Sequence, residues 1–293
     1  TMQRWSMDAL GRESLRLVQE PVPQPGPGEV RVRVNAVALN YRDKMVIEGT
    51  MPIPLSFPFT PASDMAGVVD SIGEGVTRFK PGARVISTFF PEWIDGKPQA
   101  VARDLPYKTS GGYFQGMLAE YVIVSENALV ASPESLDDAE ASTLPCAGLT
   151  AWFALVERGH LRAGQSVLVQ GTGGVALFAL QIAKAHGAEV FVSSGSDEKL
   201  ARAKKLGASQ GINRLKGDWA ENTLALTQDR GIDHIIETVG GDNLRHSLRA
   251  VAVHGRISVI GVLAGTEISL PASELLLKSP VIQGIGVGHR RAL

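Results

Sequence analysis

Apolar and charged residues alternate in the first part of the chain with the period of a half-buried strand. Val30, Val32 and Val34 alternate with Arg31 and Arg33, which predicts one face in a core and one in water. Pro and Gly residues separate several further apolar runs. Strands are predicted there at Met65–Ser71, Arg84–Ser87 and Leu118–Val124. The polar stretch 91–116 contains Gly and Pro, and we expect a long loop there.

The pattern changes near residue 135. Asp137 and Glu140 have the spacing of a capping box, and helical material follows that is expected to break at Pro145 and end near Gly159. Beyond it, apolar runs alternate with helical patterns. Strands are predicted at Ser166–Gln170, Ala188–Ser193, Ile232–Val239, Arg256–Gly261 and Val281–Val287. This alternation indicates an α/β fold with a doubly wound parallel sheet over 131–293, after a β-rich domain over 1–130.

The helix expected after the first of these strands has a clear apolar periodicity. One helical face is predicted to carry Val175, Phe178, Ala179, Ile182, Ala183 and His186. Gly187 lies where a glycine commonly ends a helix. The segment therefore reads as a strand, a tight turn and a helix, in that order.

The turn between this strand and this helix is rich in glycine. Gly171-Thr172-Gly173-Gly174-Val175-Ala176 fits the pattern G-x-G-x-x-A of dinucleotide-binding proteins. Glycines allow the backbone to turn sharply and approach a pyrophosphate, and the helix N-terminus offers free N–H groups to it. We expect Gly171, Gly173, Gly174 and Val175 to bind the cofactor.

The end of the next strand bears on which cofactor is bound. NAD-binding proteins usually carry Asp or Glu there against the ribose 2′-hydroxyl, whereas this chain has Ser193 and Ser194. Hydroxyl groups, a helix N-terminus and Lys199 suit a 2′-phosphate, which favours NADPH. The alternative for Lys199 is a solvated helix face. Asp197 and Glu198 also lie near, but acids in a first helical turn commonly serve the helix dipole.

Composition excludes several classes of partner. The chain has 29 Lys and Arg against 30 Asp and Glu, a balance that gives no basic surface for nucleic acid or for an anionic membrane. A single cysteine excludes a disulfide framework and fits a reducing compartment. With no signal-peptide pattern and no long apolar run, we expect a cytoplasmic protein.

An ordered series of stretches resembles the medium-chain dehydrogenase/reductase superfamily, and within it the quinone oxidoreductase branch. These stretches are Pro27–Val30, Leu39–Asp43, Pro61–Val69, Lys80–Val85, Leu144–Ala151 and Gly171–Ala176. The resemblance implies a GroES-like substrate domain followed by a Rossmann domain. Because such proteins continue past the strand expected at Val281–Val287 to complete the substrate domain, we expect that return to be missing from a chain ending at Leu293.

The same resemblance bears on metal binding. Zinc-bearing relatives have a cysteine where this chain has Asn40, His and Glu where it has Ser63 and Asp64, and a further ligand at the place of Cys146. No histidine precedes His160, and Cys146 is the single cysteine. A catalytic zinc needs three protein ligands, so no metal is expected, and Cys146 is interpreted as a small buried residue.

Without zinc, a substrate already activated toward hydride is expected, such as a quinone or an α,β-unsaturated carbonyl. By resemblance, Asn40 and Tyr41 lie near the nicotinamide and the substrate oxygen, with Tyr41 either a hydrogen-bond donor or a packed aromatic. Arg42 and Asp43 are expected to form a structural pair. The resemblance also assigns Thr150 to the cofactor. Further cofactor contacts are expected at the strand ends, from Asn213, Arg214, Thr238, Val239, Gly261 and Val262.

Three functions stay open at this stage. The first is a zinc-independent, NADPH-dependent reductase, and the others are an NADPH-binding sensor without turnover and a zinc-type alcohol dehydrogenase. The apolar strand at 281–287 resembles an outermost Rossmann strand, which in this family often pairs with its two-fold mate. It therefore predicts a homodimer.

Overall fold

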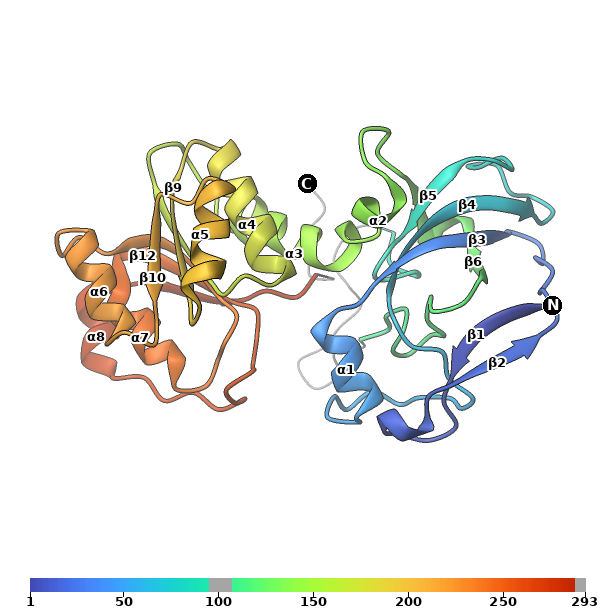
Figure 1. Cartoon of the computed structure of the whole chain (residues 1–293), viewed down its shortest axis with the longest axis horizontal. Helices are drawn as coiled ribbons and strands as arrows, with labels where there is room; N and C mark the ends of the chain where they lie inside the picture. The colour runs from blue at the N-terminus through green and yellow to red at the C-terminus, as the bar shows by residue number, and fades with distance from the viewer. Residues whose placement is uncertain (95–106, 288–293) are drawn as a thin grey trace. The chain divides into compact units, whose positions relative to one another are not determined.

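The computed structural model describes residues 1–94 and 107–287, and these form two compact units (Figure 1). The first comprises Thr1–Ala147 with Val287, and the second Gly148–Gly286. The short helix α2 (Asp138–Ala141) belongs to the first unit because Ala141 packs against Ala66 and Ile86. The structural division therefore lies after the boundary of 130/131 expected from the sequence.

The first unit is built on a five-stranded antiparallel sheet with the order β6-β3-β4-β5-β7. Val30 and Val32 of its longest strand are fully buried, as their alternation with arginines predicted. They pack with Met65, Val69, Val85 and Leu129 from the neighbouring strands. The strands are β3 (Glu29–Ala38), β4 (Asp64–Ile72), β5 (Arg84–Ser87), β6 (Tyr121–Ser125) and β7 (Leu129–Ala131).

Smaller elements complete this unit. An antiparallel hairpin pairs β1 (Met2–Ser6) with β2 (Arg16–Glu20), and a bridge between Arg4 and Ala119 joins it to the chain before β6. Helix α1 (Tyr41–Ile47) follows β3. The remaining short helices are η1 (Arg12–Ser14) and η2 (Glu126–Ala128). Of the loop expected at 91–116, residues 91–94 and 107–116 contain no helix or strand, and 95–106 lie outside the described residues.

The second unit contains the predicted doubly wound sheet. Its six parallel strands have the order β10-β9-β8-β11-β12-β13, which reverses direction between β8 and β11. This is the order of a Rossmann fold. The strands are β8 (Ser166–Gln170), β9 (Glu189–Ser194), β10 (Gln210–Asn213), β11 (Ile232–Glu237), β12 (Val251–Val259) and β13 (Val281–Gly284).

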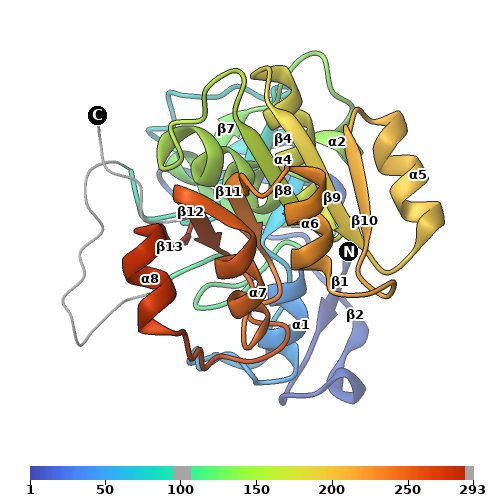
Figure 2. The same cartoon turned by 90° about the vertical axis from the view of Figure 1, so that its left-hand side faces the viewer.

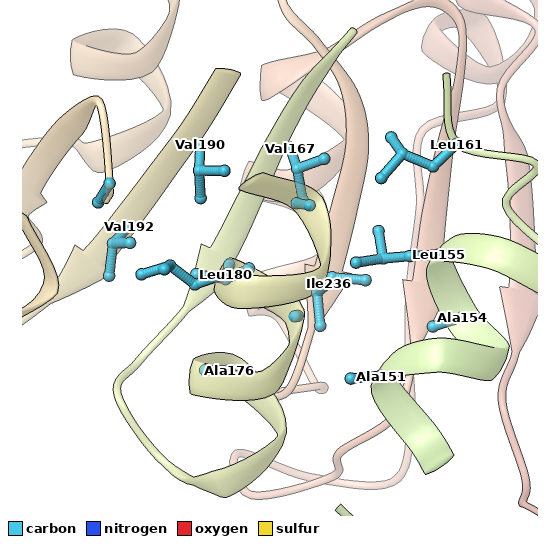
Figure 3. Close-up of a cluster of buried hydrophobic side chains, with 14 of the residues drawn as sticks. Ala151, Ala154, Leu155, Leu161, Val167, Ala176, Leu180, Val190, Val192 and Ile236 are labelled. Carbon is cyan, nitrogen blue, oxygen red and sulfur yellow. The ribbon is translucent and has the colours of Figure 1, made fainter. Parts of the chain in front are cut away.

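Helices cover both faces of this sheet (Figure 2). On one face, α4 (Gly174–Ala185) and α5 (Asp197–Lys205) pack with η4 (Phe153–Glu157) against β8, β9 and β11. Figure 3 shows the resulting cluster, with Leu180 of α4 among Val190, Val192 and Ile236 of the strands. The other face is covered by α6 (Trp219–Leu226), α7 (Asn243–Ala250) and α8 (Ala272–Lys278). No helix of the described residues is long and apolar enough to cross a membrane.

Several local predictions are confirmed. The Asp137 carboxylate accepts the backbone N–H of Glu140 at 2.8 Å, and the Glu140 carboxylate accepts that of Asp137 at 3.1 Å, which is the expected capping box. Gly187 has a positive φ of 75° after α4, where a left-handed residue ends the helix.

Other local predictions were wrong in detail. The predicted face of α4 is confirmed in part, since Ala179 and Ala183 are buried and Val175, Phe178 and Ile182 pack partly buried against the same core. Ala176 and Leu180 are also buried and were not predicted, and His186 is partly buried. Pro145 does not end the helical run but lies in a π-helical segment, η3 (Leu144–Gly148), which continues into α3 (Leu149–Trp152). The last strand is shorter than predicted and ends at Gly284.

Candidate functional site

The first candidate site lies at the carboxyl edge of the parallel sheet, in the second unit. Strand β8 ends at Gln170, and Gly171 turns the chain with a φ of 82° while its N–H donates to the Ser193 carbonyl at 2.7 Å. A Cβ added at Gly171 or Gly173 would meet nothing within 4 Å, so the loop faces open space. Helix α4 starts at Gly174 without a side-chain cap from Gly173. Uncapped N–H groups beside open space fit the pyrophosphate of a dinucleotide.

The ends of β9 and β10 lie beside this loop. Ser193 and Ser194 are buried, with exposed fractions of 4% and 6%. The backbone N–H of Arg214 donates to the Ser194 carbonyl at 3.0 Å. The Arg214 guanidinium reaches to Gly195, with Nη2 3.4 Å from the position that a Cβ would take there. Lys199 is exposed on the first turn of α5, where its N–H donates to the capping hydroxyl of Ser196.

Two carboxylates lie in the first turn of α5, of which Glu198 is exposed and Asp197 is paired. Asp197 pairs with the Lys216 ammonium at 2.7 Å and accepts the Asn213 amide at 2.7 Å. These two partners, Lys216 first, lower the pKa of Asp197. Asn213 is thus occupied in fixing the loop after β10, and its place as a direct cofactor contact stays a prediction.

The remaining predicted residues follow the other strands. Thr238 and Val239 come directly after β11, and the Thr238 hydroxyl donates to the Gln170 carbonyl at 2.9 Å. Gly261 comes shortly after β12 and packs tightly against Thr238. A Cβ added at Gly261 would lie 1.9 Å from the Thr238 carbonyl oxygen. Val262 is half exposed after it. Thr150, by contrast, is buried in α3, with an exposed fraction of 4%.

The second candidate site lies in the first unit, around Asp64 at the start of β4. This carboxylate is fully buried and accepts the Ser63 hydroxyl at 2.5 Å and the backbone N–H of Cys146 at 2.9 Å. Burial raises the pKa of Asp64 to about 6, while hydrogen bonds from Ser63, Asn40 and Cys146 oppose the shift. The Asn40 amide is near enough to act on this pKa, yet its buried Nδ2 makes no hydrogen bond of ordinary geometry.

A buried arginine holds the segment that carries Asn40. The Arg42 guanidinium donates to Thr109 Oγ1 at 2.7 Å, pairs with Asp43 at 3.3 Å and lies over the Phe89 ring at 5.0 Å. Asp43 in turn accepts the backbone N–H of Asn40 at 2.7 Å. Burial raises the pKa of Asp43, opposed by these contacts. The predicted Arg42–Asp43 pair is therefore present, and it fixes the start of α1.

Tyr41 lies outside this buried network. Its side chain is 53% exposed, and the Lys44 ammonium lies 5.3 Å from the centre of its ring. Packing in the core therefore does not account for it. Tyr107 was not predicted, although it belongs to the same surroundings, with the Arg42 guanidinium 5.9 Å from its ring and burial raising its pKa to about 12. It follows a polar stretch whose sequence gives no periodicity that would place it.

The donor set around Asp64 does not fit a zinc ion. Zinc-bearing relatives have ligands at four places, where this chain has an amide, a hydroxyl, a carboxylate and a thiol, from Asn40, Ser63, Asp64 and Cys146. Two of these four are of a zinc-ligating type, fewer than the three protein ligands of a catalytic site. Amides and hydroxyls are not the ligands of protein zinc sites, which use Cys, His and carboxylates. In residues 1–94 and 107–287, no three His, Cys, Asp or Glu side chains gather as a metal site would require.

Comparison with known proteins agrees with both units. Residues 26–134 match the alcohol dehydrogenase GroES-like domain, and residues 174–293 match the zinc-binding dehydrogenase domain. A zinc-type alcohol dehydrogenase-like protein of Schizosaccharomyces pombe is 41% identical over 288 residues, which cover 95% of this chain and 82% of that protein. A quinone oxidoreductase of Rattus norvegicus is 33% identical over 88% of this chain and 72% of its own length.

The chain belongs to the medium-chain dehydrogenase/reductase superfamily. It falls in the quinone oxidoreductase-like branch of these oxidoreductases, as the sequence stretches indicated. Among solved structures, a putative alcohol dehydrogenase from Sinorhizobium meliloti 1021 matches with a TM-score of 0.94 and 62% identity, over 99% of this chain and 85% of that one. The GroES-like and Rossmann expectations are thereby confirmed.

The raised pKa of Asp64 makes a prediction about stability. Between its ordinary value of 3.8 and about 6, the folded state binds this proton more tightly than the unfolded state. The free energy of unfolding therefore falls as the pH rises through this window and then levels off. Relative to Asp64→Asn, which does not titrate, the wild type should lose about 2–3 kcal/mol between pH 4 and pH 7. Urea denaturation across this range measures the difference.

Asp138→Asn is the matched control. Hydrogen bonds from Asn35 and Arg84 lower the pKa of Asp138 below 3.8, so its stabilising effect is lost only at lower pH. Between pH 4 and pH 7 its difference from the wild type should stay constant. A constant difference for Asp64→Asn as well would show that burial does not shift the Asp64 pKa.

Proposed function

We propose that this oxidoreductase is independent of zinc, uses NADPH, and transfers hydride to a quinone or an α,β-unsaturated carbonyl. One observation carries the proposal. At the four places of the zinc ligands, Asn40 and Ser63 supply an amide and a hydroxyl, and Asp64 and Cys146 alone are of a zinc-ligating type, so this set does not fit the metal. The reaction must then proceed without a Lewis acid.

The choice of substrate follows from that chemistry. Oxidising a simple alcohol requires removal of a proton whose pKa is far above 7, and bound zinc makes this feasible. A conjugated acceptor spreads the arriving negative charge onto its oxygen, so one or two hydrogen-bond donors suffice. When bound, the nicotinamide supplies the hydride, and the protein supplies orientation and donors.

Residues of the first unit are assigned to the substrate. Tyr41 presents an exposed hydroxyl, and Asn40 presents an amide donor whose Nδ2 lacks a hydrogen bond of its own. The exposed Tyr41 is the first candidate to donate to the oxygen that gains charge, and the Asn40 amide, which is buried beside Asp64, is the second. The Arg42–Asp43 pair holds both residues by fixing the first turn of α1.

Residues of the second unit are assigned to the cofactor. The pyrophosphate is received by the glycine loop and the N-terminus of α4, at Gly171, Gly173, Gly174 and Val175. The 2′-phosphate lies against Ser193 and Ser194, with Lys199 and Arg214 as its cations. The strand-end residues Asn213, Thr238, Val239, Gly261 and Val262, together with Thr150, line the rest of the dinucleotide.

The cofactor assignment predicts a selective loss of NADPH affinity. Lys199→Ala and Arg214→Ala each remove a cation proposed to bind the 2′-phosphate, a group that NADH lacks. One charge-assisted contact is worth roughly 1.5–3 kcal/mol, or about ten- to a hundredfold in Kd. Calorimetry should show that loss for NADPH and almost no change for NADH. Lys205→Ala, an exposed lysine at the far end of α5, is the control. Wild-type protein that binds NADH as tightly as NADPH would refute the assignment.

The reaction itself is tested by turnover. We expect NADPH oxidation with 1,4-benzoquinone and with an enone, unaffected by a chelator, and no reduction of NADP⁺ by ethanol. Tyr41→Phe removes one proposed donor to the oxyanion and should lower enone turnover by about 10²–10³. Its NADPH affinity should not change. The enone is the sharper substrate because a hydroquinone anion is stable without help.

Each contrary outcome identifies a different function. Tight NADPH binding without turnover of any acceptor favours a sensor, and chelator-sensitive ethanol oxidation favours a zinc alcohol dehydrogenase. If Tyr41→Phe keeps full enone turnover, the donor is Asn40 and not Tyr41. Lys44→Met, which removes the ammonium beside the Tyr41 ring and leaves the hydroxyl, is the matched control and should keep most of the activity.

We also propose that the protein is a homodimer. Strand β13 is the last strand of its sheet, and in the described residues no strand pairs with its outer side. Val281 on this strand and Leu276 and Leu277 on α8 are exposed, with fractions of 41%, 80% and 79%. An uncovered apolar edge favours pairing with a second copy. Light scattering at micromolar concentration should give twice the chain mass, and Ile282→Pro should give one chain mass. A wild type with the mass of one chain contradicts the dimer.

A further inference from the structure

A buried carboxylate that sequence reasoning missed stands at the carboxyl edge of the parallel sheet. Glu237, the last residue of β11, has an exposed fraction of 0%. Its contacts in the described part of the chain are hydrogen bonds from neutral groups. An ionised carboxylate taken out of water needs such donors, and here they come from three separate segments.

The two oxygens of Glu237 serve different partners. Oε1 accepts the backbone N–H groups of Val239 and Gly240 at 2.9 Å and 3.0 Å, which fixes the turn after β11. Oε2 accepts the Gln170 amide at 3.0 Å and the Ser247 hydroxyl of α7. The Asn243 amide donates to both oxygens at 3.0 Å. Each of these neighbours donates a hydrogen bond to Glu237. The side chain at this position therefore has to accept hydrogen bonds at both of its terminal atoms, which a carboxylate does and an amide does not.

Gln170 carries this network into the glycine loop. It is the residue before Gly171, and its Oε1 accepts the Thr238 N–H at 3.3 Å. The Gln170 amide orientation is therefore fixed by donors on one side and by the Glu237 acceptor on the other. The backbone carbonyl of Glu237 accepts the N–H groups of Ile260 and Gly261, at 2.8 Å and 3.2 Å. These backbone bonds join the chain after β12 to the end of β11. The ends of β8, β11 and β12 meet at one residue.

We propose that Glu237, acting through Gln170, is the positioning residue of the dinucleotide site. The pair holds the loops that start at Gly171 and Thr238 in one fixed arrangement, and the Glu237 carboxylate acts on the cofactor through them and not by contact. This inference rests on the proposed assignment of those loops to NADPH. It explains why a carboxylate, and not a third apolar residue after Ile235 and Ile236, ends the buried strand Ile232–Glu237.

The test exchanges the two side chains. Glu237→Gln turns an amide N–H₂ toward a donor in either orientation, the Gln170 amide on one side or the Val239 and Gly240 N–H groups on the other. Gln170→Glu places two carboxylates at hydrogen-bond distance. The double variant Gln170→Glu/Glu237→Gln restores one donor facing one acceptor. We expect each single variant to raise the Kd of NADPH about ten- to a hundredfold, because one charge-assisted hydrogen bond is lost. The double variant should recover most of the affinity. In steady state the singles should raise KM for NADPH and leave kcat at saturating NADPH nearly unchanged.

Asp233→Asn is the matched control, since Asp233 lies near the amino end of the same strand. Its carboxylate accepts the Ser166 N–H at 2.7 Å and pairs with Arg230 at 3.1 Å. It should lower the thermal midpoint and leave the NADPH Kd unchanged. The proposal is overturned if Glu237→Gln binds NADPH like the wild type, if a folded double variant shows no recovery, or if Asp233→Asn weakens NADPH equally. A wild type that binds no dinucleotide contradicts the cofactor assignment itself.

Discussion

A carboxylate withdrawn from water has to be surrounded by donors, and both candidate sites are arranged around this constraint. Asp64 in the first unit and Glu237 in the second are each fully buried. Asp64 gathers a hydroxyl and a backbone N–H, from Ser63 and Cys146. Glu237 gathers two backbone N–H groups, two amides and a hydroxyl. In each case one donor comes from far along the sequence, Cys146 for Asp64 and Gln170 for Glu237, so satisfying the charge also fixes the backbone that surrounds it.

The two carboxylates differ in how fully they are satisfied. Around Asp64 burial dominates and raises its pKa to about 6. Close by, Asp43 has the Arg42 guanidinium as a partner, and Arg42 is itself held by Thr109 and the Phe89 ring. The Arg42–Asp43 pair thus stabilises the start of α1, while Asp64 forms no ion pair within residues 1–94 and 107–287. A site of this composition can donate hydrogen bonds and hold charge, but it has no set of ligands that would retain zinc.

Much of the second unit could be predicted from the sequence because its signals are local. The strand Ser166–Gln170, the glycine turn and the helix that begins at Gly174 lie within twenty residues, and each has its own pattern. The buried face of α4 was predicted less completely than the strand and the turn. An alanine such as Ala176 gives a weak hydrophobic signal, although its small side chain allows close packing on the sheet. The break expected at Pro145 was also wrong. Pro145 lacks a backbone N–H, which would break an α-helix but is tolerated in the π-helical segment Leu144–Gly148.

The contacts that complete the sites could not be predicted, because they are long-range. Arg42 contacts Thr109 and the Ser110 carbonyl in a loop with no periodicity, and Glu237 contacts Gln170 at the end of the neighbouring strand β8. For the Glu237 contacts, the sequence did contain a signal that could have been used. Glu237 is the acidic residue at the end of the apolar run Ile235-Ile236, and an acid at the carboxyl end of a buried parallel strand has to be matched by donors from neighbouring loops. Because those loops are where a Rossmann sheet binds its ligand, the same residue that satisfies the fold also sets the geometry of the cofactor site.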